Sequence, residues 1–288
     1  MKNTVSVTTN KPEVSIVPFQ EGSVLVGVED YAQDANIGLE QIGADERAVP
    51  FLRILQRNSP QCDDNSDVPG ARPGMIFNTA TQEVYSGQTG LLFVPAFRDH
   101  NYVEFIPRIN GGGFVGLWDA SDSEILRLRQ KHGSFGKLTN ENGNELVETY
   151  YLYGLMIPPG KGPDDPPSPP APCVVPFAST QIKKYRAIMA RLSTMFIDPI
   201  KLPGKVYPIF AHVLRVGTVQ ESNKHGTFYG WRIGLASESA ELCRIRPDSM
   251  LYIEAKKLAH ELKEGKLRAA FEGESVVTQN YGDDDIPL

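Results

Sequence analysis

The chain has 288 residues, of which 41% are hydrophobic and 9% aromatic, and its formal net charge is −6. This composition is typical of a folded globular protein, and no stretch approaches the roughly 18 consecutive apolar residues that a membrane-spanning helix needs. The three cysteines (Cys62, Cys173 and Cys243) form no CxxC pair. Together with the lack of a signal-type apolar run after Met1, this favours reduced thiols and a cytoplasmic location.

The charge is unevenly distributed along the chain. Residues 272–288 carry five acidic residues and no Lys or Arg, so the remainder has a net charge of −1 (−6 + 5). Residues 176–232 carry nine Lys or Arg and two acidic residues, a net charge of +7 (9 − 2). A basic stretch of this kind is one signature of a nucleic-acid-binding protein.

The first half of the chain predicts mainly short strands. Residues 1–45 show no sustained hydrophobic period, and we expect a flexible or peripheral segment there. From Val49 the pattern is β-like, with an apolar run at 50–56, a loop at 59–74 and strands at 75–77, 83–85, 91–97 and 102–106. Gly111–Gly113 predicts a turn, Asp119 or Ser121 the cap of a short helix, and Asn142-Gly143 a hairpin turn before a strand at 147–157.

The second half follows a proline-rich stretch at 158–172, which predicts an extended loop or linker because proline lacks the amide donor. Next we expect a helix capped by Ser179 or Thr180 and running to about Phe196, strands at 207–220 and 227–235 joined by a loop at 221–226, and a helix from Pro247 to about Gly265. We therefore predict a mainly β (α+β) protein: an elaborated OB-type β-barrel domain at 46–265 with peripheral helices, followed by a disordered acidic tail at 266–288.

Sequence-independent binding of single-stranded DNA needs cations near the phosphates and rings that stack on bases. The predicted hairpin and the helix before it carry both, and the predicted contacts are Lys183, Lys184, Arg186, Arg215, Lys224, Phe228, Tyr229, Trp231 and Arg232. Alternation along a strand places Tyr229 and Trp231 on one face and Phe228 and Arg232 on the other. We expect Tyr229 and Trp231 to stack on bases, and the alternative is a hairpin whose aromatic residues belong to the core.

The last six residues, Asp283-Asp284-Asp285-Ile286-Pro287-Leu288, combine three carboxylates with an apolar end. Such a segment can dock into an apolar pocket with a basic rim on a partner protein, although acidic ends also serve solubility alone. Residues 282–288 resemble the acidic tip of bacterial single-stranded DNA-binding proteins, in which Asp-Asp-Asp-Ile-Pro is followed by phenylalanine rather than by leucine. Over roughly residues 50–235 the strand pattern is similar to that of bacteriophage single-stranded DNA-binding proteins.

The resemblance implies a protein that coats single strands during DNA replication, recombination and repair. It also implies that residues 283–288 recruit replication and recombination proteins, and that a phage-encoded chain acts in the host cell cytoplasm. Two alternatives stay open: a recombination mediator or annealing protein, and a phage structural or interaction protein that binds no DNA. The sequence allows a homo-oligomer.

Enzyme signatures are poor. There is no GxxxxGK[ST], HExxH or GxSxG motif, and the five histidines show no metal-ligand spacing with one another or with the cysteines. The acidic pairs Asp63-Asp64 and Asp164-Asp165, which a nuclease would use for magnesium, lie in Pro- and Gly-rich loops without a third carboxylate at a recognisable spacing. We expect no catalytic activity, no cofactor and no metal.

Overall fold

The computed structural model describes residues 48–132, 138–160, 167–223 and 226–270. The chain divides into two units, Met1–Ile42 and Gly43–Leu288, and every described residue lies in the second. The described part is mainly β, with antiparallel sheets and a few helices, as predicted. The elements in chain order are β1 (Leu52–Ile54), η1 (Pro60–Cys62), β2 (Ile76–Asn78), β3 (Val84–Tyr85), β4 (Leu91–Ile106), η2 (Arg108–Asn110), β5 (Gly113–Asp119), α2 (Ser123–His132), β6 (Leu138–Thr139), β7 (Glu145–Ile157), β8 (Ala171–Ala178), η3 (Ser179–Gln181), α3 (Ile182–Ser193), η4 (Ile209–Ala211), β9 (Leu214–Asn223), β10 (Gly226–Leu235) and α4 (Met250–Lys263).

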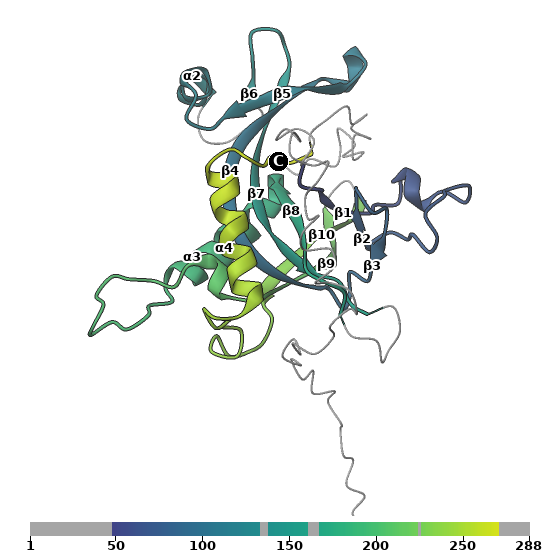
Figure 1. Ribbon diagram of the computed structural model, residues 1–288. Coiled ribbons are helices and arrows are strands. Elements are labelled where there is room, and N and C mark those ends of the chain that lie inside the picture. The colour runs from purple at the N-terminus through teal and green to yellow at the C-terminus, as the bar shows by residue number, and fades with distance from the viewer. Residues whose placement is uncertain (1–47, 133–137, 161–166, 224–225, 271–288) are drawn as a thin grey trace, which may run out of the picture. The chain divides into compact units, whose positions relative to one another are not determined.

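Strand β4 organises the larger sheet (Figure 1). It pairs with β7 along one side, and on the other side with β9 at residues 91–93 and with β5 at residues 101–106. The sheet therefore has the order β10-β9-β4-β7-β8 at one end and β5-β4-β7-β6 at the other. The prediction of separate strands at 91–97 and 102–106 was wrong. A register shift between Pro95 and Phe97 accommodates the proline, and a single strand continues through it.

The sheet does not close into a barrel within the described residues, because no ladder joins β8 to β10. Side chains span the gap instead. The indole Nε1 of Trp231 donates to the carbonyl of Pro176 on β8 at 2.8 Å, and the amide of Gln56 pairs with both N and O of Tyr229 on β10 at 2.9 and 2.8 Å. Gln56 thus covers part of the free edge of β10, which would otherwise present unpaired backbone groups.

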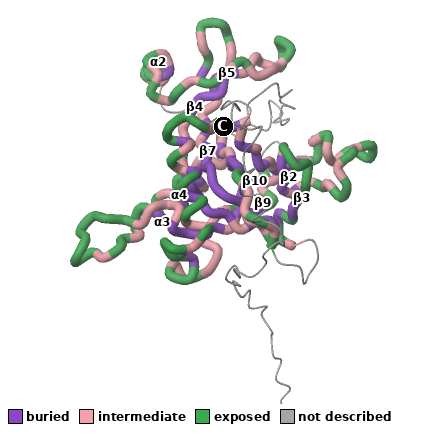
Figure 2. The backbone as a smooth tube through the Cα atoms, in the orientation of Figure 1, coloured by how far each residue is buried: buried purple, intermediate pink, exposed green. Residues whose placement is uncertain are grey.

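Three hydrophobic clusters support this arrangement. The first packs β1, β2, β3, β4, β7, β8, β9 and β10 together with α3, and includes Phe93, Phe177 and Trp231. The second covers the other side of β4, β7 and β8 with α4, through Ala255 and Leu258. The third holds α2 and β6 at the far end of β4 and β7. Figure 2 shows the buried positions gathered along these strands and the exposed ones along the loops that follow β1 and α3.

The helices that precede and follow the hairpin are confirmed, with changes at their ends. α3 begins at Ile182, with Gln181 at the N-cap position instead of the predicted Ser179 or Thr180, and it ends at Ser193 rather than near Phe196. α4 begins after Ser249, whose hydroxyl accepts from the amide of Tyr252 at 3.3 Å. The predicted strand at 207–220 starts only at Leu214, because residues 209–211 form η4. Before α2, the capping side chain is Asp122 rather than Asp119 or Ser121, since its carboxylate accepts from the amide of Glu124 at 2.8 Å.

Candidate nucleic-acid interface

The β9–β10 hairpin has one face in the core and one outside. Cross-strand pairs share a face, and Trp231 lies opposite Thr218 while Arg232 lies opposite Gly217. Trp231 is 3% exposed and belongs to the first core cluster. The prediction that Trp231 stacks on bases is therefore corrected: its ring closes the core against Phe177, at a centroid separation of 6.3 Å.

Tyr229 lies on the same inner face and packs against the core. A Cβ atom added to Gly74 would lie 2.5 Å from Cε1 of Tyr229, so this ring rests directly on the backbone of the loop before β2. One face of the ring is thus covered by protein. The structure gives Tyr229 a packing role, although its side chain stays partly exposed.

The outer face of the hairpin carries Arg215, Phe228 and Arg232. Arg232 is exposed, and Arg215 and Phe228 are partly exposed. Arg215 Nη1 donates to the carbonyl of Thr89 at 3.3 Å, and Arg232 Nη2 donates to the carbonyl of Gln88. Both guanidinium groups are therefore anchored on the loop between β3 and β4 while remaining accessible.

Helix α3 presents a basic face to solvent. Tyr185, Ile188 and Leu192 are buried at helical spacing, and the exposed positions include Lys183, Arg186 and Arg191. The helix has no acidic residue of its own. Lys183 and Arg186 are neighbours on this surface, since they are three residues apart, whereas Arg191 comes five residues after Arg186 and lies further round the exposed half of the helix.

Lys184 ties α3 to the hairpin rather than facing solvent. Its Nζ lies 2.5 Å from Glu221 Oε1, and its side chain is 18% exposed. Glu221 lies opposite Phe228 in the ladder, so α3 adjoins the outer face of the hairpin at this point. Burial opposes ionisation of Glu221, but the hydrogen bonds from Lys184 and Gln181 outweigh it and hold the pKa of this carboxyl below its usual value.

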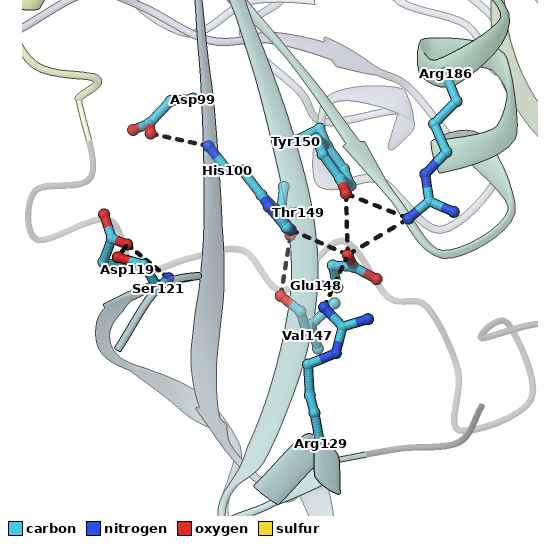
Figure 3. Close-up of polar contacts among 10 residues, drawn as sticks. All are labelled: Asp99, His100, Asp119, Ser121, Arg129, Val147, Glu148, Thr149, Tyr150 and Arg186. Atoms are coloured by element: carbon cyan, nitrogen blue, oxygen red, sulfur yellow. Dashed lines mark hydrogen bonds and ion pairs between the residues drawn. The ribbon is translucent and has the colours of Figure 1, made fainter. Parts of the chain in front are cut away.

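On the other side of α3, donors from several elements converge on Glu148 of β7 (Figure 3). Oε1 of Glu148 lies 3.0 Å from His100 Nε2, 3.2 Å from the hydroxyl of Tyr150, 3.6 Å from Arg186 Nη2 and 3.9 Å from Arg129 Nη1. The hydrogen bond from His100 is the largest cause of a lowered pKa for Glu148, and it outweighs burial of the carboxyl. The carboxylate thus neutralises part of a cationic cluster contributed by α2 and α3.

The same cluster contains a stack of rings. His100 and Tyr150 stack at 4.0 Å between centroids with 7° between their planes, and Tyr150 stacks on Tyr185 at 4.7 Å. Both faces of Tyr150 are therefore occupied. Arg186 reaches the hydroxyl of the same tyrosine, to which its Nη2 donates at 3.2 Å, and its side chain is still 60% exposed.

Sequence reasoning did not find His100, Arg129, Glu148 or Tyr150. They come from α2, β4 and β7, and His100 and Tyr150 meet only through the register of the β4–β7 ladder. That register depends on the bulge at Pro95. The alternating pattern of β7 was the one available signal, and it does not specify a partner strand.

The remaining predicted residues fall outside the described part of the chain. Lys224 lies outside the described residues, and so do the predicted partner-binding residues Asp283, Asp284, Asp285, Ile286, Pro287 and Leu288. Among the described residues no group of three His, Cys, Asp or Glu could hold a metal ion. No helix in the described ranges is long and apolar enough to cross a membrane.

Comparison with known proteins gives one result. Residues 19–268 match a family described as Pam3 phage gp34-like protein. The chain belongs to this family. No curated protein and no solved structure matches. The matched part of the chain includes α3 and the β9–β10 hairpin, whereas residues 283–288 lie beyond it.

Proposed function

We propose that this protein binds single-stranded DNA without sequence preference and without catalysing a reaction. The observation that carries the proposal is the basic face of α3, where Lys183, Arg186 and Arg191 are exposed on a helix with no acidic residue. The outer face of the hairpin, which α3 contacts through Lys184 and Glu221, adds Arg215 and Arg232. Cations arranged along a β-structure in this way are suited to follow a phosphate backbone.

The outer face also supplies a ring. Phe228 is partly exposed on the face of β10 opposite to Tyr229 and Trp231, the face that also carries Arg232 four residues further along the strand. A base stacked on such a ring contributes about 1–3 kcal/mol regardless of its identity. Phe228 takes the stacking role that the sequence analysis gave to Trp231.

The strand arrangement supports an elaborated OB-type architecture as part of the proposal. Five strands in the order β10-β9-β4-β7-β8 curve around the first core cluster. The side chains of Gln56 and Trp231 span the open edge. OB-type folds are often partly open barrels, and they bind single strands across their sheet surface and loops.

The second part of the proposal concerns the acidic segment 283–288. We expect it to recruit replication and recombination proteins by its three aspartates and its apolar end, while the body coats the strand. A family named for a phage protein is consistent with this activity in the cytoplasm of a host cell. Deletion of residues 283–288 should abolish capture of such partners and leave the fold intact.

The experiment is fluorescence anisotropy with labelled oligo-dT, a duplex competitor and a salt titration. The full chain should prefer the single strand and lose affinity as salt rises. The double variant Lys183→Glu/Arg191→Glu should bind at least tenfold more weakly. Lys257→Glu/Lys263→Glu, which reverses two exposed lysines on α4, serves as the matched control and should bind like the wild type. The proposal would be refuted if oligo-dT bound to neither the wild type nor the control variant.

A second candidate is a phage interaction protein that binds no DNA. The specific observation in its favour is the exposed apolar segment after α3, in which Ile200 is 93% exposed. Exposed apolar clusters mark protein contacts. Indifference to oligo-dT in the experiment above would favour this candidate.

A further inference from the structure

The segment 194–207, which follows α3, forms an exposed arm. The amide of Ile197 donates to the carbonyl of Lys205 at 3.0 Å, and Phe196 forms an antiparallel bridge with Val206. The amide of Leu202 donates to the carbonyl of Asp198 at 2.8 Å and closes the turn. Figure 1 shows the arm extending away from the end of α3 as a narrow loop.

Large apolar side chains are concentrated on this arm. The exposed ones are Phe196 (44%), Ile197 (40%), Ile200 (93%), Leu202 (45%) and Val206 (39%). Scattered apolar residues on a surface are ordinary, but five of them on one short hairpin mark a contact site. The arm has a net charge of +1 (2 − 1), because it carries Lys201 and Lys205 against Asp198, and Nζ of Lys201 lies 3.9 Å from Oδ2 of Asp198.

A second exposed apolar surface carries two glutamates. It is formed by the loop 237–249 and the first turn of α4, and its exposed apolar side chains are Leu242 (67%), Met250 (52%) and Ile253 (45%). Glu238 and Glu241 are exposed in the first part of this loop, and the later part carries Arg244, Arg246 and Asp248, of which Arg246 pairs with Asp248 at 2.7 Å. Neither of them forms an ion pair with another described residue. We call this surface the acidic patch.

The arm and the acidic patch are adjacent where they join the rest of the protein. Cζ of Arg244, from the loop of the acidic patch, lies 4.1 Å from the ring centroid of Tyr207 at the base of the arm. Tyr207 is itself joined to the other side of that base, since its amide donates to the carbonyl of Met195 at 2.9 Å. One face of the molecule therefore holds a basic apolar element beside an acidic apolar one.

We propose that the chain forms a symmetric dimer in which the arm of each copy lies on the acidic patch of the other. A two-fold axis near Tyr207 and Arg244 exchanges the two elements, so that Lys201 and Lys205 meet Glu238 and Glu241 of the other copy. The apolar side chains meet in the same exchange. Such self-complementarity is what a two-fold interface requires, with apolar groups at its centre and charges at its rim.

The dimer is independent of the proposed DNA contacts, because the interface uses none of Lys183, Arg186, Arg191, Arg215 or Arg232. It is tested on the full chain without DNA, by sedimentation velocity and light scattering over a range of micromolar concentrations. The wild type should have twice the 31.8 kDa mass of the chain. DNA affinity is measured separately, so loss of one property does not imply loss of the other.

Charge reversal gives the decisive comparison. Lys201→Glu/Lys205→Glu should make the chain monomeric, and so should Glu238→Lys/Glu241→Lys. The four changes together should restore the dimer, because the reversed charges attract again. Arg108→Glu/Lys131→Glu, two exposed cations outside the interface, is the matched control and should remain dimeric. Circular dichroism confirms that each variant is folded.

The opposite results would overturn the dimer. A wild type that stays monomeric would mean that the arm binds the acidic segment 283–288 or another protein instead of a second copy of the chain. A wild type that dimerises while the reversals have no effect would place the interface elsewhere. Failure of the fourfold variant to recover the dimer, with each double variant monomeric, would refute the pairing of arm and acidic patch.

Discussion

At the scale of single residues, Trp231 and Phe228 have opposite roles although they lie three positions apart on one strand. Trp231→Ala should lower the free energy of unfolding by about 3–5 kcal/mol, because it removes a buried ring and leaves a cavity. Phe228→Ala should change stability by about 1 kcal/mol or less, yet weaken oligo-dT binding by about 1–3 kcal/mol. Urea denaturation and anisotropy on the same two variants check both statements. A stable Trp231→Ala protein with weakened DNA binding would reverse the assignment.

Glu148 is a second residue with a measurable effect. Its carboxylate lies against Arg186 and Arg129 and offsets part of their charge. Glu148→Gln keeps the shape and an acceptor but removes the charge, and charge effects at such partly exposed sites are worth about 0.2–1 kcal/mol. We therefore expect a gain in oligo-dT affinity of roughly 1.4- to fivefold at low salt, which shrinks as salt screens the charges. Glu141→Gln, on a side chain that is 81% exposed, is the control; an equal gain there would remove the special role of Glu148.

At the scale of elements, the packing of the Tyr229 ring on Gly74 links β10 to the loop before β2. Gly74 has φ +86°, which favours glycine, and an added Cβ would meet the tyrosine ring at 2.5 Å. Gly74→Ala should therefore displace Tyr229 and lower the melting temperature by several degrees. Gly70→Ala is a matched control, because its φ is +75° but nothing lies within 4 Å of the added Cβ. If the melting temperature fell equally in the two variants, backbone strain alone would explain the loss, and the contact between Gly74 and Tyr229 would have no effect of its own.

The sequence predicted the individual helices and strands better than it predicted which of them lie next to one another. The helix α3 follows from local apolar spacing, and the alternation of β10 correctly separated Tyr229 and Trp231 from Phe228 and Arg232. Which of those faces is buried depends on Gln56, Gly74 and Pro176, which are distant in sequence. The Glu148 cluster depends likewise on the β4–β7 register. Local patterns contain no information about these pairings.

At the scale of the whole molecule, the buried His212 makes stability depend on pH. Burial is the largest cause of its lowered pKa, and the nearby guanidinium of Arg244 acts in the same direction. The unfolded chain therefore binds the proton more tightly than the folded protein does. Stability should be greatest above the unfolded pKa of about 6.5 and should fall as the pH drops below it. Urea denaturation at pH 7.5 and 5.5 should show this loss, and His212→Gln should reduce it; an unchanged pH dependence in the variant would contradict the prediction.

The measurement that tests the central claim most directly is photocrosslinking of the full chain to oligo-dT containing 5-iododeoxyuridine, followed by peptide mass spectrometry. The proposed interface predicts crosslinks in peptides from α3 and β10, with Phe228 among the modified residues, and competition by unlabelled single strand but not by duplex. No crosslinking, or crosslinks confined to α4 and the arm 194–207, would contradict single-strand binding by the basic face of α3 and the outer face of the hairpin.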